Sequence, residues 1–175
     1  MIRNIRGQAI TLAAEKGDQP GANQMELVDW GGDGDPAFVW QEPRGGDVCI
    51  AEAGVVWSDL EISSVELQCT SPAGLTGGGG PGLRSIFESY LNRAADGFDG
   101  IMLSTSEEVE SISCSGKSFP VHEIMEGGPS GAKMRLYWVA FPLALGGDYT
   151  AEVQHDGVRD SQKVHIYAKG AAACH

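Results

Sequence analysis

The sequence predicts a mainly β protein, an antiparallel β-sandwich of about ten strands with one amphipathic helix packed on its flank. The first observation is the glycine content, because 25 glycines in 175 residues are about twice the usual share of roughly 7%. The second is a succession of short apolar runs that end at Gly, Pro or Asp, which indicates many turns. The third is that a single stretch keeps a clear helical period. The length favours one β-rich domain over residues 1–175.

Strand-like runs follow one another through the first part of the chain. In one of them, Met25 and Leu27 alternate with Gln24 and Glu26, which is the period of a half-buried strand. Turn-rich residues separate this run from its neighbours. We therefore expect strands at residues 8–14, 24–30, 37–41, 47–57 and 63–69.

The predicted helix follows a glycine-rich segment. Residues 71–82, SPAGLTGGGGPG, have no periodicity and indicate a loop. Apolar side chains then recur at i, i+3, i+4, i+7, i+8 and i+11, a continuous stripe. They are Leu83, Ile86, Phe87, Tyr90, Leu91 and Ala94. We expect an amphipathic helix over about 82–95 that covers one face of a sheet.

Strands resume at residues 100–105, 108–115 and 119–125, and the strongest is 134–141, MRLYWVAF. Both faces of this last strand are apolar, so it lies either in the centre of the sheet or against another subunit. Its residues are therefore candidate interface residues: Met134, Leu136, Tyr137, Trp138, Val139 and Phe141.

The last strands form a hairpin around Asp156-Gly157, a favoured two-residue turn. Pairing His155 with Val158 is the register that separates polar from apolar side chains. In that register one face holds Tyr149, Ala151, Val153, Val164 and Ile166.

Charge and hydropathy exclude some partners. The net charge of −12 argues against direct binding to nucleic acid or to anionic lipid, since both present phosphate. No segment approaches the roughly 18 apolar residues of a membrane span, so we expect no membrane insertion. The apolar run near the start is too short for a secretory signal. We expect the chain to be synthesised in the cytoplasm and either to remain there or to be incorporated into a particle. Export by a route without such a signal is the alternative.

The four cysteines form no C-x-x-C pair, which excludes a zinc knuckle or a thioredoxin-like site. Cys49, Cys69 and Cys114 each lie in a strand-like run, where a free thiol packs as a small apolar group. Because no export signal is present, we expect free core thiols in preference to disulfides.

The stretch DWGGDGDPAFVW, residues 29–40, resembles no complete metal loop. Counted as a calcium loop from its first aspartate, it has glycine at position 3 and tryptophan at position 12, where ligands are needed. A looser cation site from Asp29, Asp33 and Asp35 remains a candidate, with a divalent cation as the one cofactor indicated. The alternative, which we favour, is an acidic connection between strands.

Aromatic and catalytic candidates are few. Trp30 and Trp40 bracket the acidic stretch and are candidate ligand-stacking residues, with burial in the core as the alternative. The glycine-rich run matches G-x-G-x-x-G almost automatically, without the buried strand that a nucleotide site needs. We predict no catalytic residues, although Cys114 with His122 could form a nucleophilic pair in space.

Three functions remain open. The lack of a catalytic motif and the doubly apolar strand 134–141 favour a non-enzymatic, self-assembling structural subunit of a larger particle, such as a phage tail or virion component. Its partners would be further copies or other protein subunits. The first alternative is a β module that binds a sugar, a cation or a protein through its end loops. The second is a small enzyme whose site combines distant His, Asp and Cys residues.

Overall fold

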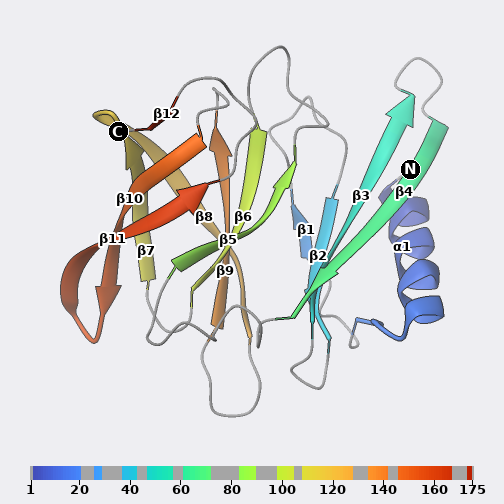
Figure 1. Ribbon diagram of the computed structural model, residues 1–175. Helices are drawn as coiled ribbons and strands as arrows, with labels where there is room; N and C mark the ends of the chain where they lie inside the picture. Colours follow the sequence, from blue (N-terminus) through green and yellow to red (C-terminus); the bar gives the residue numbers. More distant parts are fainter. Residues whose placement is uncertain are drawn as a thin grey trace. The chain divides into compact units, whose positions relative to one another are not determined.

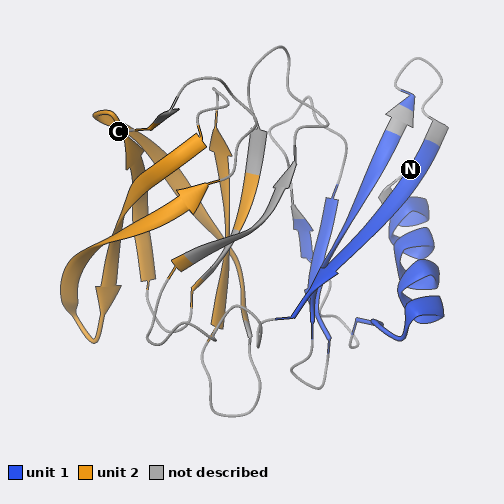
Figure 2. Cartoon of the chain, in the orientation of Figure 1, with its two compact units in different colours: residues 1–78 blue, residues 79–175 orange. Residues whose placement is uncertain are grey.

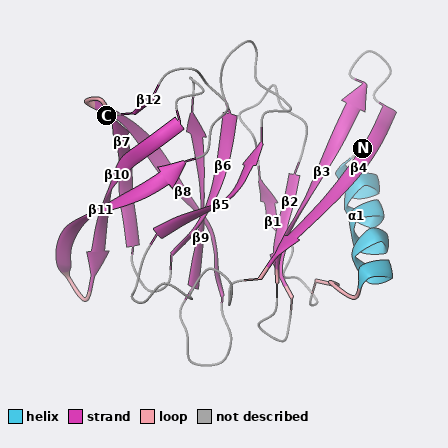
Figure 3. Ribbon diagram, in the orientation of Figure 1, coloured by secondary structure: helices cyan, strands magenta, loops and turns pink. Residues whose placement is uncertain are grey.

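The computed structural model describes residues 2–20, 26–28, 37–42, 47–56, 61–71, 83–89, 98–104, 108–127, 134–141, 146–166 and 173–174. In this part of the chain it has one helix and twelve strands, nearly all antiparallel, which confirms the predicted class (Figures 1 and 3). The elements are α1 (Ile2–Lys16), β1 (Glu26–Val28), β2 (Ala37–Gln41), β3 (Val48–Val56), β4 (Glu61–Thr70), β5 (Leu83–Ser89), β6 (Phe98–Ser104), β7 (Glu108–Cys114), β8 (Lys117–Gly127), β9 (Met134–Phe141), β10 (Gly146–His155), β11 (Val158–Ile166) and β12 (Ala173–Cys174).

The chain forms two compact units, residues 1–78 and residues 79–175 (Figure 2). The boundary falls within the glycine-rich segment 71–82, of which only Ser71 is described. Each unit has a hydrophobic core of its own. The length of the chain predicts a single domain, and this stays a prediction.

Unit 1 is a four-stranded antiparallel sheet in the order β1-β2-β3-β4, with α1 packed against it. Its core joins one side of the helix to one face of the sheet and consists of Ile5, Ala9, Ala13, Phe38, Trp40, Cys49, Ala51 and Ala53. Ala9 and Ala13 follow Ile5 at spacings of four residues, so all three lie on the same side of the helix. The small alanines allow the helix to pack closely on the large side chains of β2.

The prediction of a strand at residues 8–14 was wrong, because this segment belongs to α1. Alanine has a high helix propensity, and the helix ends in a well-defined motif at Gly17. The Gly17 N–H donates to Ala14 O at 3.3 Å, and the Asp18 N–H donates to Ala13 O at 2.9 Å. Gly17 has a φ of +82°, which suits the left-handed C′ position of this Schellman motif.

The predicted helix over about 82–95 was also wrong: its first half is strand β5, and residues 90–97 lie outside the described residues. β5 pairs with β6, and the register shifts between Ser85 and Phe87. A bulge of this kind breaks the strict alternation of a strand, so the sequence shows a period closer to that of a helix. The β-branched and aromatic residues of the segment also favour a strand.

Unit 2 is an eight-stranded sheet that runs β11-β10-β7-β8-β9-β6-β5, with β12 beside β10. β8 joins two parts of it, because Lys117–Pro120 pairs with β7 and Val121–Gly127 pairs with β9. The core lies between these parts in a sandwich-like arrangement, and seven strands contribute to it. Phe119, Phe141 and Tyr149 pack at its centre, with ring centroids 5.2 to 6.1 Å apart.

Two predictions about unit 2 are confirmed. The hairpin of β10 and β11 has the predicted register, with His155 opposite Val158. Asp156 and Gly157 have φ values of +49° and +79°, as a type I′ turn requires. The strand 134–141 is β9, which lies within the sheet between β8 and β6, so the first of its two predicted positions is the observed one.

Candidate interaction site at the β4 edge

The acidic loop predicted as a possible cation site, residues 29–36, lies outside the described residues. Asp29, Asp33, Asp35 and Trp30 all lie outside them, so the cation site stays a prediction. Trp40 is described, and no part of it is exposed. Its Nε1 donates to the backbone oxygen of Asp18 at 2.8 Å. Trp40 is therefore a core residue, and its ring offers no face to a ligand.

The candidate interface residues on β9 are buried, except Trp138, which is half-buried. Tyr137, Val139 and Phe141 belong to the core of unit 2. The Tyr137 hydroxyl accepts a hydrogen bond from the Val109 N–H at 3.3 Å, and burial raises the pKa of this phenol. With these side chains inside the unit, β9 does not offer the broad apolar surface that the sequence suggested.

The three described histidines each have a different neighbour. His122 stacks on Trp138 with the ring centroids 5.1 Å apart, and His165 Nδ1 is 2.7 Å from Asp148 Oδ1. His155 Nε2 lies 3.3 Å from a carboxylate oxygen of Asp156. None of these three contacts includes a serine, threonine or cysteine side chain.

The prediction of free thiols was wrong, because the structure joins the four cysteines in two disulfides. Cys49 and Cys69 are directly opposite on β3 and β4, with their Cα atoms 4.1 Å apart. Cys114 and Cys174 have Cα atoms 5.5 Å apart. Neither a position in a strand-like run nor the compartment decides which thiols meet, whereas the strand register does. Cys114 is therefore no free nucleophile for His122.

The edge of unit 1 at β4 is the most distinctive site among the described residues. β4 has ten residues, and within the described part of the chain it pairs with β3 alone. At the opposite edge of the same sheet, β1 has only three residues. A short edge strand offers little backbone for pairing, whereas a long one presents a row of unpaired N–H and C=O groups.

The register shows which groups of β4 point away from β3. The Cα spacing of 4.1 Å between Cys49 and Cys69 is that of a non-hydrogen-bonded pair, for which about 4.5 Å is usual. Alternate residues share this orientation, so the backbone N–H and C=O groups of Val65, Leu67 and Cys69 point outward. The side chains of the same three residues pack on the helix side of the sheet.

A groove of about 650 Å³ lies beside this edge. Helix α1 lines it with residues spaced three and four apart, and β4 contributes one residue. The lining residues are Asn4, Gly7, Gln8, Thr11, Leu12 and Val65. A Cβ atom added at Gly7 would meet no atom within 4 Å, so space is open above this position. A sheet edge with a helix alongside is a geometry that accepts an added extended strand.

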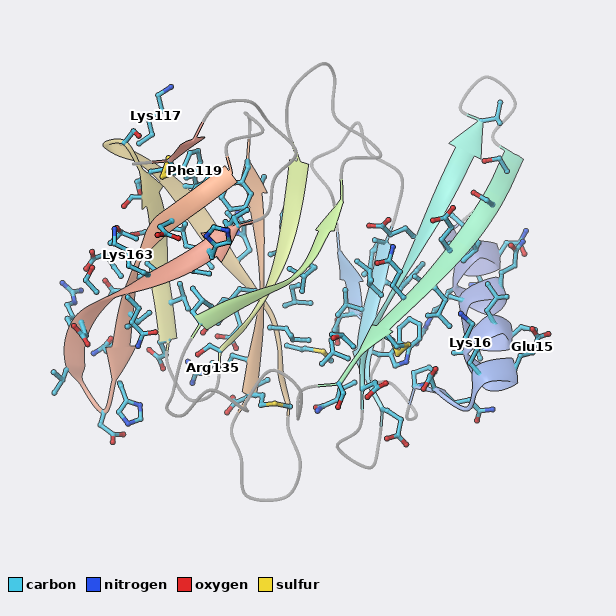
Figure 4. All side chains as sticks on the ribbon, in the orientation of Figure 1. Glu15, Lys16, Lys117, Phe119, Arg135 and Lys163 are labelled. Atoms are coloured by element: carbon cyan, nitrogen blue, oxygen red, sulfur yellow. A yellow bond between two sulfur atoms is a disulfide. The ribbon has the colours of Figure 1, made fainter. Side chains whose placement is uncertain are left out.

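One side chain partly covers the edge. Lys16, in the last turn of α1 (Figure 4), places its Nζ 3.5 Å from the carbonyl oxygen of Leu67. Lysine on an edge strand is a common device against uncontrolled strand pairing. This contact is long and exposed, so an incoming strand could displace the flexible lysine side chain.

No helix in the described part of the chain combines the length and apolarity of a membrane span. Comparisons with protein families, with curated proteins and with solved structures found no match for this chain.

The β4 edge was not among the predicted sites, because the sequence patterns were interpreted as a strand at residues 8–14 where the structure has α1. The signals were present: Ile5, Ala9 and Ala13 repeat at helical spacing, and Lys16-Gly17 is a helix-end pattern. The free edge itself has no sequence signal, because a strand becomes an edge only through the order of strands in its sheet.

Proposed function

We propose that the chain is a non-enzymatic structural subunit that assembles with further copies of itself through β4. The observation that carries the proposal is the ten-residue edge strand, which pairs on one side only in the described part of unit 1. This moves the interface from the strand predicted by the sequence to the edge of another sheet. The particle to be built, a phage tail or virion for example, is part of the proposal.

The proposed contact places β4 antiparallel to β4 of a second copy across a two-fold axis at Leu67. The outward N–H and C=O groups of Val65 then form hydrogen bonds with those of Cys69 in the second copy. By symmetry, Cys69 of the first copy pairs in the same way with Val65 of the second. Glu66 lies opposite Gln68, so no two carboxylates face each other. The charges of β4 are compatible with this self-pairing.

The test is the mass in solution at several concentrations, measured by light scattering during gel filtration. The wild-type chain should pass from the monomer mass of 18.5 kDa to twice that mass as the concentration rises. Val65→Pro removes an outward N–H that bonds to nothing in β3, so the strand itself can persist. Each dimer loses two hydrogen bonds, which should weaken dimerisation by roughly tenfold or more.

Val65→Ala is the matched control, because it removes the same side chain and keeps the N–H. It should dimerise nearly as well as the wild type. Equal dimerisation of the proline and alanine variants would refute the pairing at β4.

The groove beside β4 also favours a second candidate, a binding module that takes an extended peptide of another protein. A wild-type chain that stays monomeric at every concentration would exclude self-assembly and favour this module. If the wild-type chain does associate, electron microscopy of concentrated protein would distinguish the dimer from larger tubes or shells.

A further inference from the structure

Unit 1 also contains a cluster of metal-ligating side chains close to the C-terminal end of α1. One carboxylate oxygen of Asp18 and the sulfur atoms of Cys49 and Cys69 all lie within 4.8 Å of one another. Cys49 is buried, whereas Asp18 and Cys69 are half-buried, so solvent reaches the cluster from one side. It is the one group of three metal-ligating side chains found among the described residues.

The fold fixes the position of Asp18 from two directions. Its N–H donates to Ala13 O in the Schellman motif, and its carbonyl accepts the indole N–H of Trp40 at 2.8 Å. Trp40 is itself fully buried in the core. The carboxylate is therefore attached to a backbone segment that the helix end and the core both hold.

The two sulfur atoms are also held in place when they are not bonded to each other. The pairs Val48–Thr70 and Ile50–Gln68 flank the Cys49–Cys69 pair in the β3–β4 register. These ladder contacts keep the two strands aligned without the covalent bond. Reduction should therefore produce two neighbouring thiols beside one carboxylate.

We propose that these three residues form a zinc site in the reduced protein, and that oxidation to the disulfide closes it. Two thiolates and one carboxylate suit Zn²⁺, and a water molecule would complete four ligands. Zinc binding would increase the distance between the two sulfur atoms from that of a disulfide bond to about 3.8 Å. This is the sulfur–sulfur distance in a tetrahedral site with Zn–S bonds of about 2.3 Å. The half-exposed side of the cluster gives the ion its entry path.

The chemistry balances with a dithiol as the reductant. The dithiol transfers two electrons and two protons, the Cys49–Cys69 bond breaks, and the dithiol becomes a disulfide. Each protein thiol then loses its proton to solvent as its sulfur binds Zn²⁺. In the reverse direction, a disulfide oxidant accepts the electron pair from the two thiolates and two protons from solvent and becomes a dithiol. The Cys49–Cys69 bond forms, and the ion is released.

The molecule contains its own control. The second disulfide, Cys114–Cys174, belongs to unit 2, and no third ligand joins it in a cluster among the described residues. The variant Cys114→Ala/Cys174→Ala should keep the zinc site, and Cys49→Ala/Cys69→Ala should lose it. Zinc uptake that follows the unit 2 pair would overturn the proposal.

The experiment measures Zn²⁺ binding to the full chain, by competition with a coloured chelator, before and after reduction without oxygen. The reduced wild type should bind one Zn²⁺ per chain, and the oxidised form should lose this binding. Alkylation followed by mass spectrometry should show that zinc lowers the labelling of Cys49 and Cys69 and leaves the labelling of Cys114 and Cys174 unchanged.

Asp18→Asn is the decisive variant, because it keeps all four cysteines and the backbone contacts of residue 18. Loss of the carboxylate should weaken zinc binding by about tenfold or more, since even outer-shell changes commonly cost that much. Glu15→Gln, an exposed change in α1 (Figure 4), is the control for lost charge and should bind as the wild type does. Absence of zinc uptake by the reduced wild type, or equal affinity of Asp18→Asn, would leave only a structural disulfide.

Discussion

The two units are built from similar strands and differ in how their sheets end. In unit 2 the edge strands β5 and β11 lie against each other, and the Leu83 N–H donates to the Gln162 side-chain oxygen at 3.4 Å. In the described part of unit 1 the sheet is open, and β4 has one neighbouring strand and a helix beside it. A sheet that returns on itself leaves little edge for another chain. Among the described residues, the long edge with a single paired neighbour is therefore that of unit 1, where we propose the contact.

The disulfides give the largest expected difference between the units. The Cys114–Cys174 bond closes a loop of 60 residues, and the Cys49–Cys69 bond closes one of 20. The chain-entropy model then gives about 4 kcal/mol for the longer loop and about 3 kcal/mol for the shorter. Replacing each pair by alanine should lower the free energy of unfolding in that order, as urea denaturation would measure.

The reverse order would contradict this ranking of the two units. It would mean that the adjacent strands of unit 1 depend on their covalent link more than the closed sheet of unit 2 does. Near-ultraviolet circular dichroism should accompany the urea curves, to show that each variant keeps its packed core.

A smaller effect is expected from the buried hydroxyl of unit 2. Tyr137→Phe keeps the ring in the core and removes the acceptor of the Val109 N–H. A buried donor left without its partner costs about 1 to 3 kcal/mol. The unfolding free energy should fall by that amount, and an unchanged value would show that water reaches the Val109 N–H.

The same residue gives a pH dependence. Burial raises the pKa of Tyr137, so the folded chain keeps the phenol proton to a higher pH than the unfolded chain does. The stabilisation is fully present below the ordinary tyrosine pKa of about 10, and it is lost as the pH rises through the folded value. The stability difference between wild type and Tyr137→Phe should therefore shrink above about pH 10. A difference that grows with pH would contradict this sign.

Two glycines give the smallest effects, with opposite signs in the two units. A Cβ at Gly147, where φ is +123°, would lie 2.9 Å from the backbone oxygen of Cys174. Gly147→Ala should destabilise unit 2 by more than about 1 kcal/mol, because both the conformation and the space are unfavourable. Gly7→Ala should stabilise α1 by about 0.5 to 1 kcal/mol, since it fills open space within a helix. Thermal unfolding of the two variants would check both signs.

Local patterns predicted a large part of the fold. The hairpin at Asp156-Gly157 was predicted with its register, because turn chemistry and alternation agree there. The strand 134–141 was predicted with its bounds. The first helix and strand β5 were exchanged, because an alanine-rich segment and a bulged strand each show a misleading period.

The candidate sites were less predictable than the fold. Nothing in the spacing of the four cysteines identifies their partners, since four cysteines allow three pairings. Trp40 could have been a ligand platform or a core residue, and only its burial against α1 decided between them. The proposed zinc cluster joins a helix end to two strands, so no short motif marks it.

The sequence by itself determined that the chain is rich in strands, that the last hairpin turns at Asp156-Gly157, and which of its faces is buried. These properties depend on neighbouring residues, whose periodicity is set by backbone geometry. Only the tertiary structure decided that β4 is an edge, that Cys49 lies opposite Cys69, and that Asp18 lies beside both. Such contacts join residues far apart in the chain, and they form because burying apolar surface selects one order of strands over its alternatives.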